Sequence, residues 1–273
     1  MEESADRIHA QGLGLAAISY DSPEVLKQFA ARAHITFPLL SDADSAVIRR
    51  YAILNDTVAK GTPQYGIPYP GTYVLDARGV VTGKFFEDDY RVRDTPASML
   101  LRQFGLMPAV HQSLDAKHLK LGASASDDAV RSGQRITLAV EIDLPNRVHV
   151  YAPGVEGYIP VALSLTKTPA FQPDPAVFPP SKSMTLAVIH ETVPVYEGRF
   201  RVIETITIGN AQELQPLLDT DRNLTIEGAF RYQACDDREC FIPETVPLKW
   251  TVKVLPFDRT RVPTEIQKKG GDR

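Results

Sequence analysis

Apolar and polar residues alternate one by one along several stretches of the C-terminal half of this chain, and this pattern limits its fold most. Between 136 and 144, apolar residues take every second position, with Thr137, Glu141 and Asp143 among those between them. A period of two is that of a strand with one buried face. The alternation returns at 184–188, 224–232 and 248–254. Strands separated by loops, such as the proline-rich 169–180, predict an all-β sandwich of immunoglobulin-like architecture.

The N-terminal part of the chain follows a different pattern. A short apolar run at 12–19 suits a buried strand, and residues 71–76 and 80–87 are typical of two strands joined by a turn. Ser22 followed by Pro23 provides a helix N-cap and a first helical residue. Two further helices are predicted to begin at Asp44 and Thr95. This order of strands and helices predicts an α/β fold.

These patterns divide the chain into four segments. We expect an α/β domain at 1–107, a linker at 108–123, a β-sandwich at 124–257 and a charged tail at 258–273. The whole chain has 273 residues, enough for two domains that each have a core.

Composition excludes some classes of function. The net charge of -4 gives no basic footprint for binding nucleic acid, and no apolar run is long enough to cross a bilayer. The six histidines are scattered without metal-ligand spacing, so neither a metal nor an organic cofactor is predicted. The start of the chain is acidic and polar, unlike a signal peptide.

The only two cysteines of the chain, Cys235 and Cys240, lie in one short window. The four polar residues between them predict a hairpin loop, whose flanking residues face each other with Cα atoms ~4.5–5.5 Å apart, close enough for a disulfide. Counting alternate positions from Tyr232 places Cys235 on the outward face, which predicts a pair near solvent. Closing so short a loop stabilises the fold by only about 2 kcal/mol. A redox-active pair and a structural hairpin disulfide both stay open, and a zinc site is weaker because no histidine is near.

Three motifs in the N-terminal part carry a family resemblance. Residues 18–24, 37–42 and 69–76 resemble the later part of a peroxiredoxin, in the redoxin (AhpC/TSA) branch of the thioredoxin-like fold. The resemblance implies that Pro70 matches the family's cis-proline. It also implies a reactive cysteine at a helix N-terminus, yet no cysteine precedes Cys235. We therefore expect 1–107 to be a fragment that lacks the N-terminal cysteine segment and performs no peroxiredoxin chemistry alone.

The cysteine window carries a second resemblance. Residues 232–235, Cys240 and 243–245 are similar to the N-terminal domain of the thiol:disulfide interchange protein DsbD, an immunoglobulin-like periplasmic domain. The resemblance implies that Cys240 exchanges with partners and that Cys235 is its resolving mate. It also implies a cap loop at 195–198 through which Tyr196 covers the pair. The supporting residues it implies are Tyr196, Tyr232 and Pro243, with Pro70 from the first motif set.

The leading hypothesis is a thiol:disulfide oxidoreductase. Asp236, Asp237 and Glu239 raise the pKa of a neighbouring thiol, which suits a disulfide attacked by a partner's thiolate. The pair would need no cofactor and would relay electrons to or from a thioredoxin-fold protein or a membrane thiol reductase, in the bacterial periplasm. The alternatives are a non-catalytic binding or scaffolding protein with a structural disulfide, and a fragment of an antioxidant peroxidase.

Overall fold

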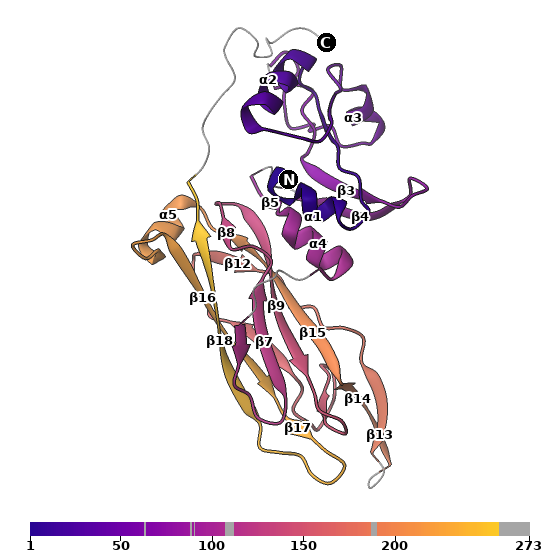
Figure 1. The fold of residues 1–273 in the computed structure, drawn as a ribbon, viewed down its shortest axis with the longest axis vertical. Coiled ribbons are helices and arrows are strands. Elements are labelled where there is room, and N and C mark those ends of the chain that lie inside the picture. Colours follow the sequence, from indigo (N-terminus) through magenta and orange to yellow (C-terminus); the bar gives the residue numbers. More distant parts are fainter. Residues whose placement is uncertain (63, 88, 90, 107–111, 187–189, 257–273) are drawn as a thin grey trace. The chain divides into compact units, whose positions relative to one another are not determined.

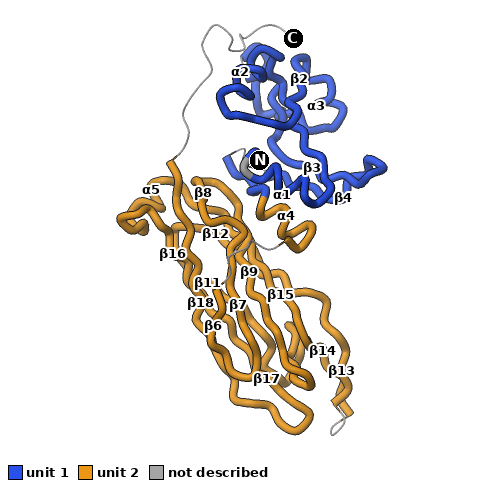
Figure 2. Tube along the Cα trace, viewed as in Figure 1, with its two compact units in different colours: residues 1–96, 257–273 blue, residues 97–256 orange. Residues whose placement is uncertain are grey.

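The computed structural model describes residues 1–62, 64–87, 89, 91–106, 112–186 and 190–256. The chain forms two compact units (Figure 2). The first comprises Met1–Pro96 and the C-terminal residues, and the second comprises Ala97–Pro256. The predicted tail at 258–273 lies outside the described residues.

The first unit combines short helices with two small sheets. Ser22 caps α2 (Pro23–Ala33) by accepting a hydrogen bond from the backbone N–H of Val25, so the predicted cap is confirmed. Strands β1 and β2 pair in parallel, and β3 and β4 pair antiparallel. Its other elements are η1 (Glu2–Ser4), α1 (Ala5–His9), β1 (Ala17–Ser19), β2 (Leu39–Ser41), α3 (Ala46–Arg50), β3 (Gly71–Leu75), β4 (Val81–Phe86) and β5 (Arg93–Asp94).

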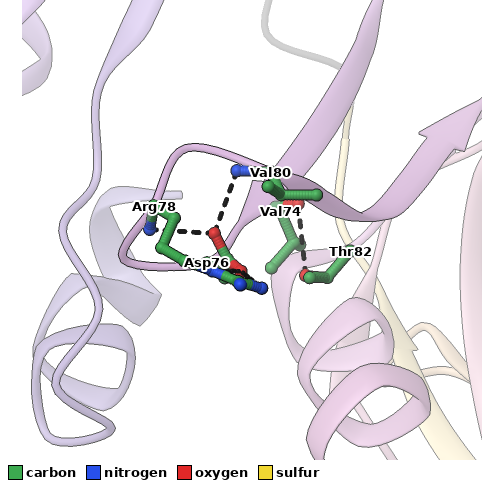
Figure 3. Close-up of polar contacts among 5 residues, drawn as sticks. All are labelled: Val74, Asp76, Arg78, Val80 and Thr82. Atoms are coloured by element: carbon green, nitrogen blue, oxygen red, sulfur yellow. Dashed lines mark hydrogen bonds and ion pairs between the residues drawn. The ribbon is translucent and has the colours of Figure 1, made fainter.

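The turn between β3 and β4 is held by Asp76, as Figure 3 shows. One carboxylate oxygen accepts hydrogen bonds from the backbone N–H groups of Arg78 and Val80, each at 2.9 Å. Gly79 takes a positive φ of 79°, which glycine adopts without a steric penalty. The predicted hairpin is therefore confirmed, and the Asp76 side chain adds to the backbone hydrogen bonds of its turn, which run from Asp76 N–H to the Val80 carbonyl and from Gly79 N–H to the Asp76 carbonyl.

The second unit is mostly β-sheet (Figure 1). Three sheets have the strand orders β12-β15-β9-β7-β6, β11-β16-β18-β8 and β13-β14-β10-β17. Its elements are α4 (Pro96–Phe104), β6 (Gln112–Leu114), β7 (Lys120–Ala125), β8 (Ala129–Val130), β9 (Gln134–Asp143), β10 (His149–Tyr151), β11 (Ala162–Leu165), β12 (Phe171–Pro173), β13 (Lys182–Leu186), β14 (Glu191–Glu197), β15 (Arg199–Ile208), α5 (Ala211–Leu214), η2 (Gln215–Leu217), β16 (Asn223–Tyr232), β17 (Ala234–Cys235) and β18 (Glu244–Val254).

The main core lies between the first two of these sheets. Apolar side chains of β9 form one cluster with those of β16 and β18, among them Leu138, Ile226 and Trp250. The indole N–H of Trp250 donates to the backbone carbonyl of Ser124 at 3.0 Å, which satisfies the polar atom of a buried ring. The strands predicted from alternation at 136–144, 224–232 and 248–254 are confirmed as β9, β16 and β18, with shifts at their ends. Of the strand predicted at 184–188, the part up to Leu186 is confirmed as β13, and residues 187 and 188 lie outside the described residues.

One face of β9 departs from the sequence prediction. Thr137 was expected to face outward, yet it is fully buried. The hydroxyl of Ser98 on α4 lies 2.7 Å from the hydroxyl of Thr137, so the helix covers this face of the strand. Helix α4 thus packs within the second unit, which begins at Ala97. The predicted domain ranges stay predictions. The compact unit starts before the predicted linker at 108–123, and that linker contains β6 and the first residues of β7.

Leu138→Ala should destabilise the second unit by about 2–5 kcal/mol, because Leu138 is fully buried in the main core. Trp250 is the only tryptophan of the chain, so its fluorescence during urea unfolding reports on this unit. Leu217→Ala is the matched control, since Leu217 is 44% exposed and its truncation should change the free energy of unfolding by less than about 0.5 kcal/mol. Equal effects of the two variants would contradict the assigned core.

Candidate functional site

The two cysteines form a disulfide across a tight hairpin. The Sγ atoms of Cys235 and Cys240 are 2.03 Å apart and their Cα atoms 4.0 Å apart. Backbone hydrogen bonds run from Asp236 N–H to the Glu239 carbonyl and from Phe241 N–H to the Ala234 carbonyl, each at 2.9 Å. The predicted four-residue hairpin loop is confirmed.

Two carboxylates of this loop, those of Asp236 and Asp237, have polar or charged partners. The Asp236 carboxylate accepts hydrogen bonds from the backbone N–H groups of Glu239 and Arg238, which lower the pKa of Asp236. The Asp237 carboxylate lies 3.8 Å from the guanidinium of Arg147, and both side chains are exposed. The loop therefore keeps negative charge next to the disulfide, as expected from the sequence.

The prediction that both cysteines lie near solvent is wrong for Cys235. Cys235 is 1% exposed, whereas Cys240 is exposed. Strand β16 ends at Tyr232, and β17 pairs not with β18 but with β10 of another sheet. Tyr232 and Ala234 both pack in the main core, so the alternation continues to Cys235, and it is the outward face that a second apolar cluster covers. One sulfur is thus packed inside, and its mate belongs to a residue at the surface.

A small aromatic cluster surrounds the buried cysteine. Cys235 packs in a cluster with Tyr151 of β10 and two valines of β14, separate from the main core. The hydroxyl of Tyr151 lies 3.6 Å from Sγ of Cys240. Burial raises the pKa of Tyr151, so its hydroxyl stays protonated at neutral pH and can donate to that sulfur. In Figure 1, β13, β14 and β17 lie at the end of the second unit opposite α5.

A second tyrosine extends this cluster outward. The rings of Tyr158 and Tyr151 lie with centroids 4.4 Å apart. The Tyr158 hydroxyl donates to the Glu191 carboxylate at 2.8 Å, and this hydrogen bond raises the pKa of Tyr158 to about 12. Tyr158 therefore also stays neutral, and its hydrogen bond to Glu191 holds its own ring beside that of Tyr151.

His149 lies beside the disulfide on the same strand as Tyr151. It is 5% exposed and stands opposite Cys235 in the register of β10 and β17. Its ring meets the ring of Tyr151 edge-on, with centroids 5.5 Å apart. Burial lowers the pKa of His149, against the opposing effect of nearby Glu197.

Tyr196 does not cover the disulfide, so that expectation is corrected. Adjacent residues of a strand face opposite sides. Val195 of β14 packs in the cluster of Cys235, so Tyr196 faces the main core, where it stacks on Phe200 with ring centroids 4.4 Å apart. Its hydroxyl donates to the carbonyl of Pro179 at 2.8 Å. The predicted cap loop at 195–198 is instead the end of β14 and a turn at Gly198.

Tyr232 and Pro243 flank the hairpin in sequence but have different surroundings. Tyr232 is buried in the main core, and its hydroxyl lies 2.7 Å from the carbonyl of Lys117 and beside the Glu244 carboxylate. Burial and the hydrogen bond with Glu244 raise the pKa of Tyr232. Pro243 is exposed and directly precedes β18. The structure thus places Tyr232 as an anchor of the strand that leads to Cys235.

Pro70 lies in the first unit, directly before β3. The described residues contain no cis peptide bond, so the expectation of a cis-proline at this position is wrong. A trans bond is the form that an X–Pro peptide prefers by about 0.5–1 kcal/mol. Pro70 belongs to the first unit and the disulfide to the second.

No group of three or more His, Cys, Asp or Glu side chains in the part of the chain that the structure describes is arranged to hold a metal ion. No helix among the described residues is both long and apolar enough to pass through a membrane. The disulfide and its neighbours form the candidate functional site.

Comparison with known proteins finds two kinds of relative. Residues 1–84 match the AhpC/TSA family model. Peroxiredoxin Bcp of Escherichia coli strain K12 is 29% identical over 91 residues, which are 33% of this chain and 56% of that protein. The putative peroxiredoxin bcp of Shigella flexneri matches equally. The chain thus spans about half the length of the curated relatives it matches.

Solved structures give more distant similarities. The N-terminal periplasmic domain of ScsB from Proteus mirabilis has a TM-score of 0.34 and 16% identity, covering 49% of this chain and 47% of that one. The N-terminal domain of Neisseria meningitidis DsbD in the reduced form has a TM-score of 0.34 and 10% identity, covering 50% of this chain and 87% of that one. Both kinds of protein predicted from the sequence are therefore among those the chain resembles, but likeness at this level is too distant to transfer a function.

Sequence reasoning did not select two residues of the site, His149 and Tyr151. Neither residue was given a role by the sequence. One signal was available: a histidine and a tyrosine two positions apart in a strand share a face. Which face that is depends on the pairing of β10 with β17, which is not visible in the local sequence.

Tyr151→Phe should raise the pKa of the Cys240 thiol by about one unit, because it removes a hydroxyl that can donate to the thiolate. The measurement is the pH dependence of iodoacetamide alkylation in a chain that also carries Cys235→Ser, so that Cys240 is the only thiol. Tyr196→Phe is the matched control, since its hydroxyl bonds to Pro179 in the main core. An equal shift in both variants, or in neither, would contradict the role of Tyr151.

Proposed function

We propose that this protein is a thiol:disulfide oxidoreductase whose Cys235–Cys240 pair relays electrons to or from a thioredoxin-fold partner. The observation that carries the proposal is the difference in exposure between the two cysteines. Cys240 is open to solvent, and Cys235 is 1% exposed. A partner thiolate can reach only a sulfur that is accessible, so exchange begins at Cys240.

The exchange follows from this arrangement. The thiolate of a partner dithiol attacks Sγ of Cys240, a mixed disulfide forms, and the Cys235–Cys240 bond breaks with its electron pair on Cys235. The second thiol of the partner then attacks the partner's own sulfur in the mixed disulfide and releases Cys240. Two electrons and two protons thereby pass to this chain, and the partner becomes a disulfide. The reverse sequence passes them on.

The similarity to redoxins supports thiol redox chemistry in general, but the first unit carries no sulfur nucleophile. Every thiol of the chain lies in the window of Cys235 and Cys240. The alternative of a fragment with peroxidase chemistry in residues 1–96 therefore has no nucleophile within this sequence. We place the redox chemistry in the second unit, whose packed sheets we propose to be an immunoglobulin-like sandwich.

The compartment and the partners are part of the same proposal. A disulfide persists in an oxidising compartment, which favours a location outside the cytoplasm, such as the bacterial periplasm. The partner there would be a thioredoxin-fold protein or a membrane thiol reductase. The pair itself is the redox centre, so the reaction needs no bound cofactor. The competing function is a binding or scaffolding protein in which the disulfide only holds the hairpin.

The reduction potential separates the two functions. A relay requires a potential above about -300 mV, because a pair below that value resists reduction by glutathione and acts as a staple. The potential is measured by equilibrating the full chain in glutathione and dithiothreitol redox buffers and counting free thiols after acid quenching. A value below about -300 mV would support the structural disulfide and overturn the relay.

Single serine variants test which sulfur meets the partner. Cys235→Ser should trap a stable mixed disulfide at Cys240 with an added thioredoxin-fold protein, because the resolving thiol is gone. Cys240→Ser should trap at least about tenfold less, since the remaining Cys235 is buried. Non-reducing gel electrophoresis of the mixtures gives the yields. Equal trapping by both variants would contradict the asymmetry on which the proposal rests.

A further inference from the structure

Three side chains form a row across adjacent strands at the disulfide. In the antiparallel register, His149 of β10 stands opposite Cys235 of β17 on one side and opposite Glu197 of β14 on the other. Directly opposed residues of antiparallel strands lie on one face, with Cβ atoms ~4.5–5.5 Å apart. A carboxylate, an imidazole and the buried sulfur therefore follow one another on the face that carries the aromatic cluster of Cys235.

The imidazole in this row has an unused polar atom. His149 is 5% exposed, and its Nε2 is buried without a hydrogen-bond partner among the residues that the structure describes. A buried polar atom without a partner costs about 1–3 kcal/mol. Neither the fold nor the oxidised disulfide offsets this cost, because a disulfide sulfur carries no proton that it could donate to Nε2 of His149.

The groups around His149 set its charge. Burial lowers its pKa, while Glu197 of β14 and Asp237 and Asp236 of the hairpin raise it. Glu197 is in turn 3.7 Å from the ammonium of Lys182 on β13, and Asp237 is 3.8 Å from the guanidinium of Arg147. Tyr151 stays neutral beside the ring. The net effect leaves a neutral imidazole at neutral pH, which is the form that accepts a proton.

We propose that His149 accepts the proton of the Cys235 thiol when this sulfur attacks Cys240 and returns it when this sulfur leaves. The inference rests on the proposed relay and adds its proton acceptor. Cys235 is too buried for water to serve it freely, and the imidazole is its neighbour on the next strand.

The step balances as follows. When the reduced pair passes electrons to a partner disulfide, Cys240 attacks first and forms the mixed disulfide. Sγ of Cys235 then attacks Sγ of Cys240, its proton moves to the imidazole of His149, and the partner leaves as a thiolate. In the opposite direction, the imidazolium gives the proton to Cys235 as the Cys235–Cys240 bond breaks.

The test follows both attacks separately in the full chain. The protein is reduced, freed of reductant and mixed in a stopped-flow instrument with dithiobis(nitrobenzoate), an aromatic disulfide that releases a coloured thiolate at each attack. The first release reports on Cys240, and the second reports on the attack by Cys235. His149→Gln should slow the second release about 100-fold at pH 7, at the lower end of what general acid–base catalysis contributes, and leave the first within about twofold.

The pH profile excludes a merely structural effect. The second release of the His149→Gln variant should approach the wild-type rate only well above pH ~8.5, where a free thiol ionises, because an apolar site disfavours the thiolate. In the wild type, the rate should fall on the acid side as His149 becomes protonated. Glu197→Gln should move that fall to lower pH, because removing the carboxylate lowers the pKa of His149. This exposed position keeps the inference testable if His149→Gln does not fold.

The control and the contradicting outcomes separate the role of His149 from the relay itself. His190→Gln, an exposed histidine next to β14, is the control and should leave both releases unchanged. A wild-type second release that His149→Gln does not slow, or slows equally at every pH, overturns the role of His149 while the relay stands. A wild-type pair that releases no second thiolate refutes the proposed relay itself.

Discussion

The pairing of β17 with β10 is the interaction on which the candidate site depends. At Gln233 the chain leaves the sheet of β16 and β18 and joins the sheet of β10 and β14. The side-chain amide of Gln233 donates to the carbonyl of Phe241 at 3.0 Å, which ties the two arms of the hairpin together at the crossing. Because β17 lies beside β10, Cys235 packs against Tyr151 on the face of this sheet that is opposite to the main core, and its mate five residues later stays at the surface.

The sequence predicted well those features that depend on short-range patterns. Period two located β9, β16 and β18, and Ser22 with Pro23 located the start of α2. It failed where the answer depends on a distant partner. Thr137 has the polarity of an outward position, but α4 covers it. Cys235 keeps the outward parity counted from Tyr232, but Tyr151 and two valines of β14 cover that outward face, and the local sequence does not reveal this cover.

Tyr196, which the sequence predicted at the disulfide, and Tyr151, which the structure places there, show the same limit of prediction from local patterns. Tyr196 and Tyr151 lie on the paired strands β14 and β10, and only Tyr151 lies at the disulfide. Tyr196 is one position away from Val195, which packs beside Cys235, and one position in a strand reverses the face. The sequence could therefore indicate the region of the site but not which aromatic ring contacts the sulfur.

The difference in exposure between the cysteines also sets a chemical demand. A thiolate in an apolar cluster is disfavoured relative to one in water, so a buried cysteine that breaks and re-forms a disulfide needs its proton handled locally. An exposed cysteine has water for this purpose. The structure places an imidazole without a hydrogen-bond partner, among the described residues, opposite the buried sulfur and a tyrosine hydroxyl near the exposed one. A local proton acceptor at the buried sulfur is what the proposed relay requires and what a structural disulfide would not need.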